Sequence, residues 1–327
     1  MLLLILHACS GDPESSPDSI TPETGGNDPA DPVDTADPVD TAGPVDTADP
    51  VDTADPIDTE PPRLLSSGTH ELEHDDITRR FELYLPAALS ADAPLVVVLH
   101  GYGGSARGIQ SYSGLDSLAD SEGFAVVYPQ SRKDTWGYSC WDIRYCNYVE
   151  EADDVDFIRE VISQVREDQG LSTVFVTGMS NGGDMTYRMA CEASDIVTAA
   201  APVTGCLMRW VAESCEATAP PPMLHIHGNA DNTTLWDGDK NYTAGGYYGT
   251  LDSIGFFADL HGTGSSTIET ITDKADSSIY RIHRWSVDGG EAPVQLYEID
   301  GGGHNWPSGG AFDDFDAAEV MWAFFNR

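Results

Sequence analysis

The chain has 327 residues, enough for one α/β domain of roughly 250 residues and additional segments. Its formal net charge is -39, and residues 63–327 alone carry 40 acidic against 16 basic residues, a net charge of -24. A charge of this sign and size excludes nucleic acid and anionic membrane surfaces as favourable partners, because both would be repelled.

The first nine residues resemble the end of a bacterial lipoprotein signal. An apolar run, Met1 to Ala8, precedes Cys9 and a polar stretch. We expect residues 1–9 to direct export, with Cys9 as the site of lipid attachment and membrane tethering; an ordinary secretory signal and a frayed terminus are the alternatives. No later segment approaches the ~20 apolar residues that span a bilayer.

We expect residues 10–63 to form a disordered acidic linker. Between Asp31 and Glu60 a hexapeptide recurs five times, beginning with Asp-Pro-Val-Asp-Thr-Ala. A proline in every repeat prevents a helix, and one aliphatic side chain per repeat cannot bury a core. Prolines and like charges keep such a segment extended. Binding of calcium or a partner through the aspartates is the alternative, although nothing in the repeat holds the carboxylates in a cage.

From residue 64 to residue 327 the pattern predicts one α/β domain. Continuous apolar runs typical of buried strands alternate with the spacing of amphipathic helices. This alternation implies a mostly parallel sheet with helices on both faces. The expected strands are 77–85, 95–99, 124–128, 174–177, 196–203, 223–226, 280–285 and 294–299. The expected helices are 115–123, 153–169, 184–191 and 313–325.

Ser180 is the candidate nucleophile. It is the central residue of a G-x-S-x-G pentapeptide, residues 178–182, which lies between an expected strand and an expected helix. On such a corner a serine is held in a strained conformation, and the glycines avoid clashes with neighbouring backbone. A bare G-x-S-x-G is often only a turn, so the interpretation depends on finding suitable partners.

The sequence offers both partners that a nucleophilic serine needs, a histidine to accept its proton and an acid to orient that histidine. In α/β-hydrolases these residues follow in the order serine, acid, histidine, each after a strand. Asp231 lies just past one expected strand, and His304 lies in a glycine-rich turn after the last strand. We therefore predict a triad of Ser180, Asp231 and His304. Asp237 and Asp239 are alternative acids.

Other histidines and tryptophans near the expected site have structural or substrate-binding interpretations. His100 begins a glycine-rich turn, residues 100–104, whose N–H groups could receive an oxyanion, and we expect His100 to order that turn. Of His225 and His227 we expect one to face the site and both to be structural rather than metal ligands. Four tryptophans fall in loops near the expected cleft: Trp136, Trp141, Trp236 and Trp306. We expect them to form aromatic walls that hold an aryl or polyester acyl group; the alternative is that they are packing lids.

Beyond the N-terminal segment the chain has five cysteines, an odd number that leaves one thiol free or paired externally. Cys140 and Cys146 form the simplest local bridge. Cys215 can pair with Cys191 or with Cys206, and the sequence does not choose. None of the five is placed as a catalytic cysteine would be.

From about Thr69 to the C-terminus the chain resembles the secreted esterases of the polyhydroxybutyrate depolymerase and feruloyl esterase family. The matching segments are specific when taken together: 98–104, 128–130, 153–158, 177–183, 189–191, 201–203, 225–228 with Asp231, and 301–307. The resemblance implies an α/β-hydrolase with the same triad, and an oxyanion hole formed by the backbone N–H groups of Asn181 and Tyr102. Residues 235–237 and the repeat segment depart from the family pattern and leave substrate choice open.

These observations predict an exported serine carboxylic ester hydrolase, extracellular or attached to the cell envelope, that needs no metal or cofactor. Feruloyl or related aryl esters on plant polysaccharide are the favoured substrates. A 3-hydroxyalkanoate polyester or its oligomers are the alternative. A non-catalytic surface lipoprotein and a serine peptidase are further alternatives, and the intact serine, aspartate and histidine argue against the first of these.

Overall fold

The computed structural model describes residues 64–148, 153–272, 279–287, 289–309 and 315–327. The expected signal-like segment, residues 1–9, and the expected linker, residues 10–63, lie outside the described residues. Within the described ranges, no helix has both the length and the apolar character needed to cross a membrane.

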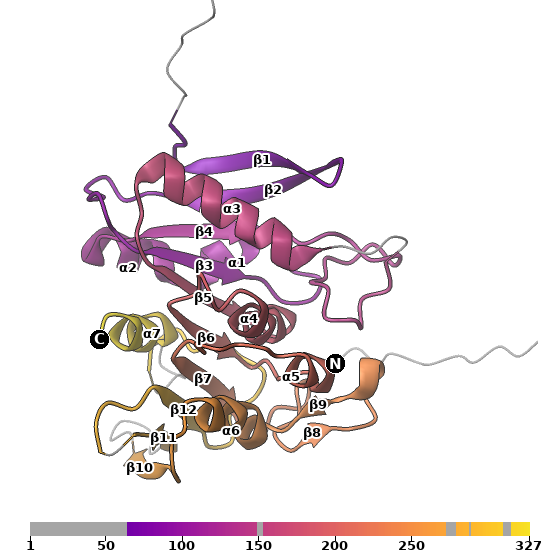
Figure 1. Ribbon diagram of the computed structural model, residues 1–327, viewed down its shortest axis with the longest axis vertical. Helices are drawn as coiled ribbons and strands as arrows, with labels where there is room; N and C mark the ends of the chain where they lie inside the picture. Colours follow the sequence, from indigo (N-terminus) through magenta and orange to yellow (C-terminus); the bar gives the residue numbers. More distant parts are fainter. Residues whose placement is uncertain (1–63, 149–152, 273–278, 288, 310–314) are drawn as a thin grey trace, which may run out of the picture. The chain divides into compact units, whose positions relative to one another are not determined.

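A ten-stranded sheet runs through the described residues (Figure 1). Its strands are β1 (Gly68–His74), β2 (Ile77–Tyr84), β3 (Leu95–Leu99), β4 (Ala125–Pro129), β5 (Val174–Met179), β6 (Ala199–Val203), β7 (Met223–Gly228), β10 (Thr267–Thr272), β11 (Ile279–Trp285) and β12 (Val294–Ile299). Their spatial order is β1-β2-β4-β3-β5-β6-β7-β12-β11-β10. The six central strands, β4 to β12 in that order, are parallel, and the pairs at both edges are antiparallel. Outside this sheet, β8 (Gly238–Asp239) pairs with β9 (Tyr247–Tyr248).

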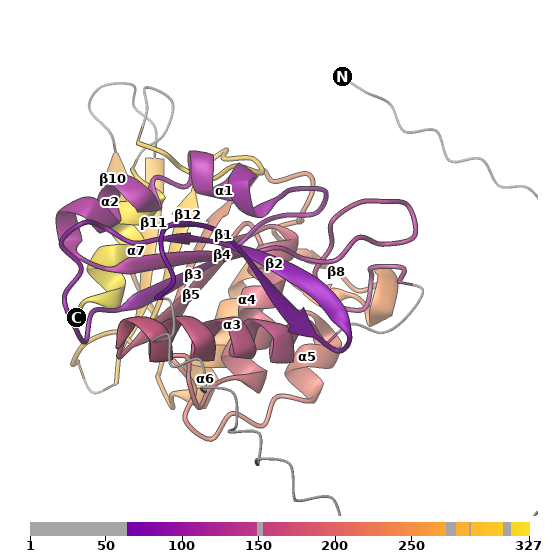
Figure 2. The ribbon, with the colours of Figure 1, turned by 90° about the horizontal axis from the view of Figure 1, so that it is seen from above.

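Helices cover both faces of the sheet (Figure 2). They are α1 (Ala106–Tyr112), α2 (Leu115–Glu122), α3 (Asp154–Gln169), α4 (Asn181–Glu192), α5 (Arg209–Glu213), α6 (Thr250–Leu260) and α7 (Ala317–Phe325). Buried side chains of α3, α4 and α6 pack with Leu95 and Val97 on one face, and those of α1, α2 and α7 pack with Val96 and Val98 on the other. Alternate residues of β3 therefore enter different cores, which explains why this strand is apolar throughout.

The predicted α/β architecture is confirmed, with differences at the ends of elements. Strands β3 and β12 have the expected bounds. Helix α7 begins at Ala317 rather than at residue 313, because the Asp316 carboxylate accepts the Ala318 N–H at 2.8 Å and caps the helix; residues 313 and 314 lie outside the described ranges. Strands β1, β8, β9 and β10 and helices α1, α5 and α6 are not among the elements predicted from the sequence.

Two disulfides join cysteines of the described residues. Cys140 pairs with Cys146, as the local spacing predicts. Cys215 pairs with Cys191, and Cys206 is a buried free thiol. The packing of α4 against α5 decides this pairing, since Cys191 lies near the end of α4 and Cys215 follows α5.

Candidate active site

Ser180 occupies a sharp turn between β5 and α4. Its φ of 57° and ψ of -123° are unfavourable for a residue with a side chain. A Cβ on Gly182 would overlap the Leu99 carbonyl, and a Cβ on Gly178 would overlap the Gly182 carbonyl. The two glycines therefore allow strand and helix to approach closely, and this geometry presents the serine at the edge of the sheet.

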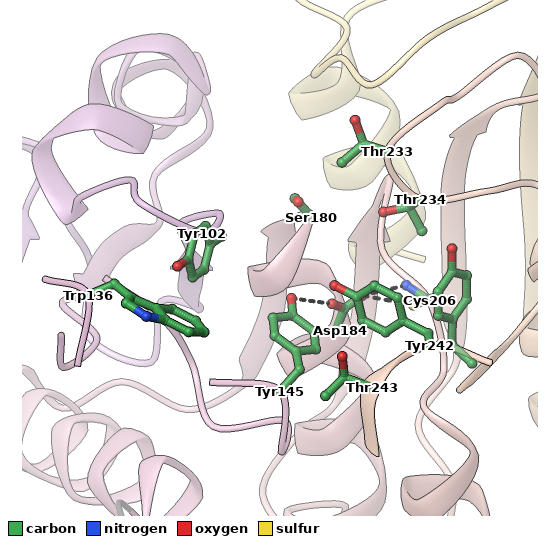
Figure 3. Close-up of a pocket in the computed structure, with 11 residues that line it drawn as sticks. Tyr102, Trp136, Tyr145, Ser180, Asp184, Cys206, Thr233, Thr234, Tyr242 and Thr243 are labelled. Carbon is green, nitrogen blue, oxygen red and sulfur yellow. Dashed lines mark hydrogen bonds between the residues drawn. The ribbon is translucent and has the colours of Figure 1, made fainter. Parts of the chain in front are cut away.

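Ser180 lines a cavity of about 330 Å³ beside this turn (Figure 3). A volume of this size is typical of a small-molecule site. Most of the lining side chains are tyrosines and threonines, together with one carboxylate and one thiol. The residues that share the cavity with Ser180 are Tyr102, Trp136, Tyr145, Asp184, Cys206, Thr233, Thr234, Tyr242, Thr243 and Tyr247.

A histidine and a buried carboxylate meet at the same edge of the sheet. His304 Nδ1 lies 2.7 Å from Asp231 Oδ2. Asp231 follows β7 and His304 follows β12, and these two strands are parallel neighbours. The second carboxylate oxygen, Asp231 Oδ1, accepts the backbone N–H groups of Thr233 at 2.7 Å and Thr234 at 3.0 Å. These bonds orient the carboxylate so that Oδ2 faces the imidazole.

Asp231 is ionised in this environment. Burial raises the pKa of its carboxyl, but hydrogen bonds from His227, from His304 and from the Thr233 N–H outweigh burial and hold the pKa well below its usual range. The Asp231 side chain is fully buried, whereas 21% of the His304 side chain is exposed. A buried carboxylate beside a partly exposed imidazole can stabilise the imidazolium that forms when the ring accepts a proton.

Both histidines of β7 lie behind this carboxylate. His227 Nε2 is 3.4 Å from Asp231 Oδ2 and 3.0 Å from the Thr234 carbonyl oxygen. His227 Nδ1 is 3.1 Å from His225 Nε2, and His225 Nδ1 is 2.8 Å from the Tyr187 hydroxyl. The expectation that only one of the two faces the site is wrong, because residues two apart on a strand point to the same face. In the part of the chain that the structure describes, no group of three or more His, Cys, Asp or Glu side chains could hold a metal ion.

Ser180 lies at the same edge as Asp231 and His304, because β5, β6, β7 and β12 are adjacent and parallel. Although Ser180 occupies the N-cap position of α4, its side chain does not cap the helix. Its hydroxyl is therefore available to the cavity. Among the described residues no hydrogen bond joins Ser180 to His304. Contacts of this kind often tighten only when substrate binds.

Two backbone N–H groups near Ser180, those of Tyr102 and Asn181, donate to no protein acceptor in the described ranges. Asn181 is the first residue of α4, so its N–H is one of the donors that every helix leaves unpaired at its start. Tyr102 lies in the turn after β3, next to Gly101, where an added Cβ would lie 3.3 Å from the Ser180 Cβ. Free N–H groups at this position are suited to receive an oxyanion.

His100 is bonded within the turn that holds Tyr102. Its Nδ1 lies 2.8 Å from the Gly101 carbonyl oxygen, and its Nε2 accepts the Ser131 N–H at 3.2 Å. Burial lowers the pKa of His100 to about 4, although the bond to Gly101 opposes this effect. The imidazole is therefore neutral near pH 7. These contacts agree with the expectation that His100 orders the turn.

Trp141 connects the two segments that carry the backbone N–H groups of Tyr102 and Asn181. Its indole N–H donates to the His100 carbonyl at 2.9 Å. Its backbone N–H donates to Asn181 Oδ1 at 2.7 Å, and its carbonyl accepts Asn181 Nδ2 at 3.2 Å. Trp141 is fully buried and lies in the loop closed by the Cys140–Cys146 disulfide. The expectation that it forms a wall of the cleft is therefore wrong, because its ring is enclosed by the core.

Substitution Trp141→Phe is expected to lower kcat for p-nitrophenyl acetate about tenfold while KM changes by less than about threefold. The change removes the bond to the His100 carbonyl, worth about 1 kcal/mol, and loosens the turn that holds Tyr102. Steady-state kinetics at fixed pH measures both constants. The matched control is Trp322→Phe on α7, which removes an indole N–H that donates to Glu122 at 2.9 Å. An equal loss of kcat in both variants would contradict the assigned role of Trp141.

Comparison with known proteins identifies the family. A protein-family model described as esterase PHB depolymerase matches residues 79–237. A curated relative, putative esterase NocK of Nocardia uniformis subsp. tsuyamanensis, is 31% identical over 252 residues, which cover 71% of this chain and 72% of the relative. The chain belongs to the esterase PHB depolymerase family. The resemblance predicted from the sequence is thus confirmed, and the family is one of carboxylic ester hydrolases.

Other relatives of this family member match over a smaller share of their length. Feruloyl esterase B of Piromyces equi is 26% identical over 69% of this chain and 42% of its own length. Poly(3-hydroxyalkanoate) depolymerase C of Paucimonas lemoignei is 25% identical over 68% of this chain and 58% of its own length. The bifunctional acetylxylan esterase/xylanase of Neocallimastix patriciarum is 32% identical over 47% of this chain, and the match spans only 22% of that protein.

Solved structures confirm the α/β-hydrolase fold of this family member. Acetyl xylan esterase from Aspergillus awamori superposes with a TM-score of 0.60 at 19% identity, over 79% of this chain and 99% of that chain. An S-formylglutathione hydrolase from Agrobacterium tumefaciens superposes with a TM-score of 0.51 at 12% identity, over 79% and 94% of the two chains. At these identities the likeness concerns the fold alone.

The other three tryptophans expected to bind substrate, Trp136, Trp236 and Trp306, occupy different places. Trp136 lines the cavity, and 66% of it is exposed. Trp236 packs against His227 with ring centroids 6.0 Å apart. Trp306 is buried, with its ring centroid 6.3 Å from that of Tyr112. Of the three, only Trp136 is among the described residues that line this cavity.

Asp184 and three of the tyrosines that line the cavity, Tyr145, Tyr242 and Tyr247, are not predicted from the sequence. Asp184 lies four residues after Ser180, which is one turn of α4, and its N–H donates to the Ser180 carbonyl at 2.9 Å. That spacing is the one signal that could have marked it. Tyr145 lies in the long loop between β4 and α3, and Tyr242 lies between β8 and β9. No local pattern in the sequence predicts where these segments run.

Proposed function

We propose that this family member is an exported serine esterase in which Ser180, His304 and Asp231 form the catalytic triad. One observation carries the proposal: the 2.7 Å contact between His304 and an ionised Asp231, at the sheet edge where Ser180 occupies its strained turn. Family membership supports the same chemistry.

The proposed reaction begins with attack of Ser180 Oγ on the ester carbonyl carbon, while His304 Nε2 accepts the hydroxyl proton. The N–H groups of Asn181 and Tyr102 receive the oxyanion of the tetrahedral intermediate. When the bond to the alcohol breaks, His304 returns the proton to the leaving alcohol, and an acyl-enzyme remains. Water then attacks the acyl group in the same way and releases the carboxylic acid. This sequence of steps requires no metal or cofactor.

Aryl esters of the feruloyl type on plant polysaccharide are the substrates we favour. Tyr145, Tyr242 and Trp136 line the cavity that contains Ser180, and flat aromatic walls suit a planar acyl group. The relative named feruloyl esterase B supports an ester of this class, and the relative named acetylxylan esterase supports an ester on a plant polysaccharide. A 3-hydroxyalkanoate polyester or oligomer is the second candidate, which the family description and the Paucimonas relative support.

Export to the cell surface or the medium is part of the proposal. The two disulfides support an oxidising compartment, and the apolar segment that ends at Cys9 supports secretion. Lipidation of Cys9 would tether the enzyme to a membrane, with residues 10–63 as the linker and residues 64–327 as the esterase domain.

A substrate panel tests the proposed function on the full-length chain. We expect it to release ferulate from feruloylated arabinoxylan and to leave a polyhydroxybutyrate suspension turbid. The reverse result would assign the polyester activity instead. Covalent labelling by a fluorophosphonate probe distinguishes a serine hydrolase from a non-catalytic binding protein, because only an activated serine reacts. Cleavage of peptide substrates in the same panel would indicate the peptidase alternative.

A further inference from the structure

A buried carboxylate faces the same cavity as the candidate nucleophile. Only 4% of Asp184 is exposed, and it lies one helical turn after Ser180 (Figure 3). Asp184 Oδ1 accepts the Cys206 N–H at 2.7 Å and the Cys206 thiol at 3.3 Å. Asp184 Oδ2 accepts the Tyr145 hydroxyl at 3.0 Å. The proposed reaction uses none of these groups.

Asp184 has the capacity to accept one more hydrogen bond. An ionised carboxylate offers about four acceptor positions, and the contacts above occupy two on Oδ1 and one on Oδ2. No lysine or arginine is among the described residues that line the cavity, so no fixed cation there neutralises the charge. Burial raises the pKa of Asp184 to about 6, and hydrogen bonds from Cys206 and Tyr145 limit the rise. A ligand hydroxyl that donates to Oδ2 would offset part of this burial cost.

The walls around Asp184 suit a ring. Tyr145 and Tyr242 meet edge to face with centroids 5.6 Å apart, and Tyr242 and Tyr247 do the same at 5.3 Å. All three tyrosines line the cavity that also contains Asp184, and Figure 3 shows the hydroxyl of Tyr145 directed at that carboxylate. A flat or gently puckered ring can lie against such faces, with a substituent directed at Asp184.

We propose that Asp184 is a specificity-determining residue, which accepts a hydrogen bond from a hydroxyl group on an uncharged ring of the ester and disfavours rings that carry a carboxylate. The inference rests on the proposed function, since it concerns the substrate of the same site. The hydroxylated ring can belong to the acyl group or to the alcohol, and both sources share the chemistry that Asp184 recognises.

Matched ester pairs test this role with the full-length wild-type chain at pH 7.5, above the pKa of Asp184. Methyl 4-hydroxycinnamate and methyl 4-methoxycinnamate differ in the acyl ring, and 4-hydroxyphenyl acetate and 4-methoxyphenyl acetate differ in the alcohol ring. In one of the pairs we expect kcat/KM to be about tenfold to a hundredfold higher for the hydroxyl member, the usual range for a hydrogen bond to a charged group. The pair that shows the preference identifies which part of the ester enters the cavity. The 4-carboxy analogue of that pair is expected to be the poorest substrate.

Substitution Asp184→Asn is expected to abolish or reverse this preference. The asparagine oxygen would accept the Cys206 N–H, so an NH₂ donor would replace the acceptor on the side of Oδ2. The ratio of hydroxyl to methoxy substrate should then fall to about one or below. Asp259→Asn, at an exposed position of α6, makes the same charge change and should leave the ratio unaltered.

A purely structural role for Asp184 predicts a different result, in which both members of each pair lose activity equally and the ratio is kept; that result would overturn the inference. Equal wild-type rates within both pairs would also overturn it, while hydrolysis of the esters would leave the proposed function intact. If no ester is hydrolysed, the proposed function fails and the inference fails with it.

If Asp184→Asn does not fold, Tyr145→Phe is the second variant. It keeps the carboxylate but removes one of its donors, so the hydroxyl preference should persist or increase. Loss of the preference would count against the inference.

Discussion

Substitution Ser180→Ala is expected to lower kcat for p-nitrophenyl acetate by about 10⁴ to 10⁶. The change removes the proposed nucleophile, so no acyl-enzyme can form, and only binding and the oxyanion hole would contribute residual rate enhancement. Alanine keeps the Cβ of serine and adds no atom to the crowded turn between Gly178 and Gly182. The folded domain should therefore persist, with an unchanged circular dichroism spectrum and a melting temperature close to that of the wild type. Burst kinetics with the wild type would report the acyl-enzyme directly.

The matched control is Ser121→Ala, at an exposed position near the end of α2. It removes a hydroxyl of the same kind and should leave both kcat and fluorophosphonate labelling unchanged. Wild-type levels of turnover in a well-folded Ser180→Ala protein would refute the assignment of the nucleophile. Labelling of another serine in that variant would point to a different site on the same fold.

Substitution Asp231→Asn is expected to lower kcat by about 10⁴, with a small change in KM. Asparagine is the same size as aspartate, but its amide cannot hold the His304 ring in the tautomer that presents a basic Nε2 to the serine, nor stabilise the imidazolium. The 2.7 Å contact with His304 Nδ1 and the strongly lowered pKa of Asp231 make this the largest effect we expect from any carboxylate of the chain. Steady-state kinetics with p-nitrophenyl acetate, over a range of pH, measures it.

Asp237→Asn and Asp239→Asn are the controls for this experiment, because the sequence allows either residue as the acid of the triad. Asp237 is exposed, and Asp239 accepts the Asn241 N–H at 2.8 Å within a local turn. In the described residues neither carboxylate bonds to His304. Both variants should keep kcat within about threefold of the wild type. A loss of 10⁴ in either one, with Asp231→Asn active, would transfer the role of the acid to that residue.

The sequence by itself determined the features that depend on neighbouring residues. Continuous apolar runs mark the central strands, because a strand covered on both faces has no polar side. The glycines around Ser180 mark the turn, because only glycine allows the backbone to approach so closely. Asp231 and His304 follow predicted strands, and parallel strands end at one edge of a sheet, so the position of both residues at the edge that carries Ser180 could be predicted without coordinates.

Only the tertiary structure decided the choices among distant residues. It brought Asp231 rather than Asp237 or Asp239 to His304, 73 residues further along the chain. It paired Cys215 with Cys191 rather than with Cys206. It also placed Asp184 beside Tyr145 in the cavity. Each of these contacts depends on the course of long loops and on the packing of helices against the sheet. The course of the loops and the packing of the helices depend on many side-chain interactions across the molecule. A short stretch of sequence therefore does not predict them.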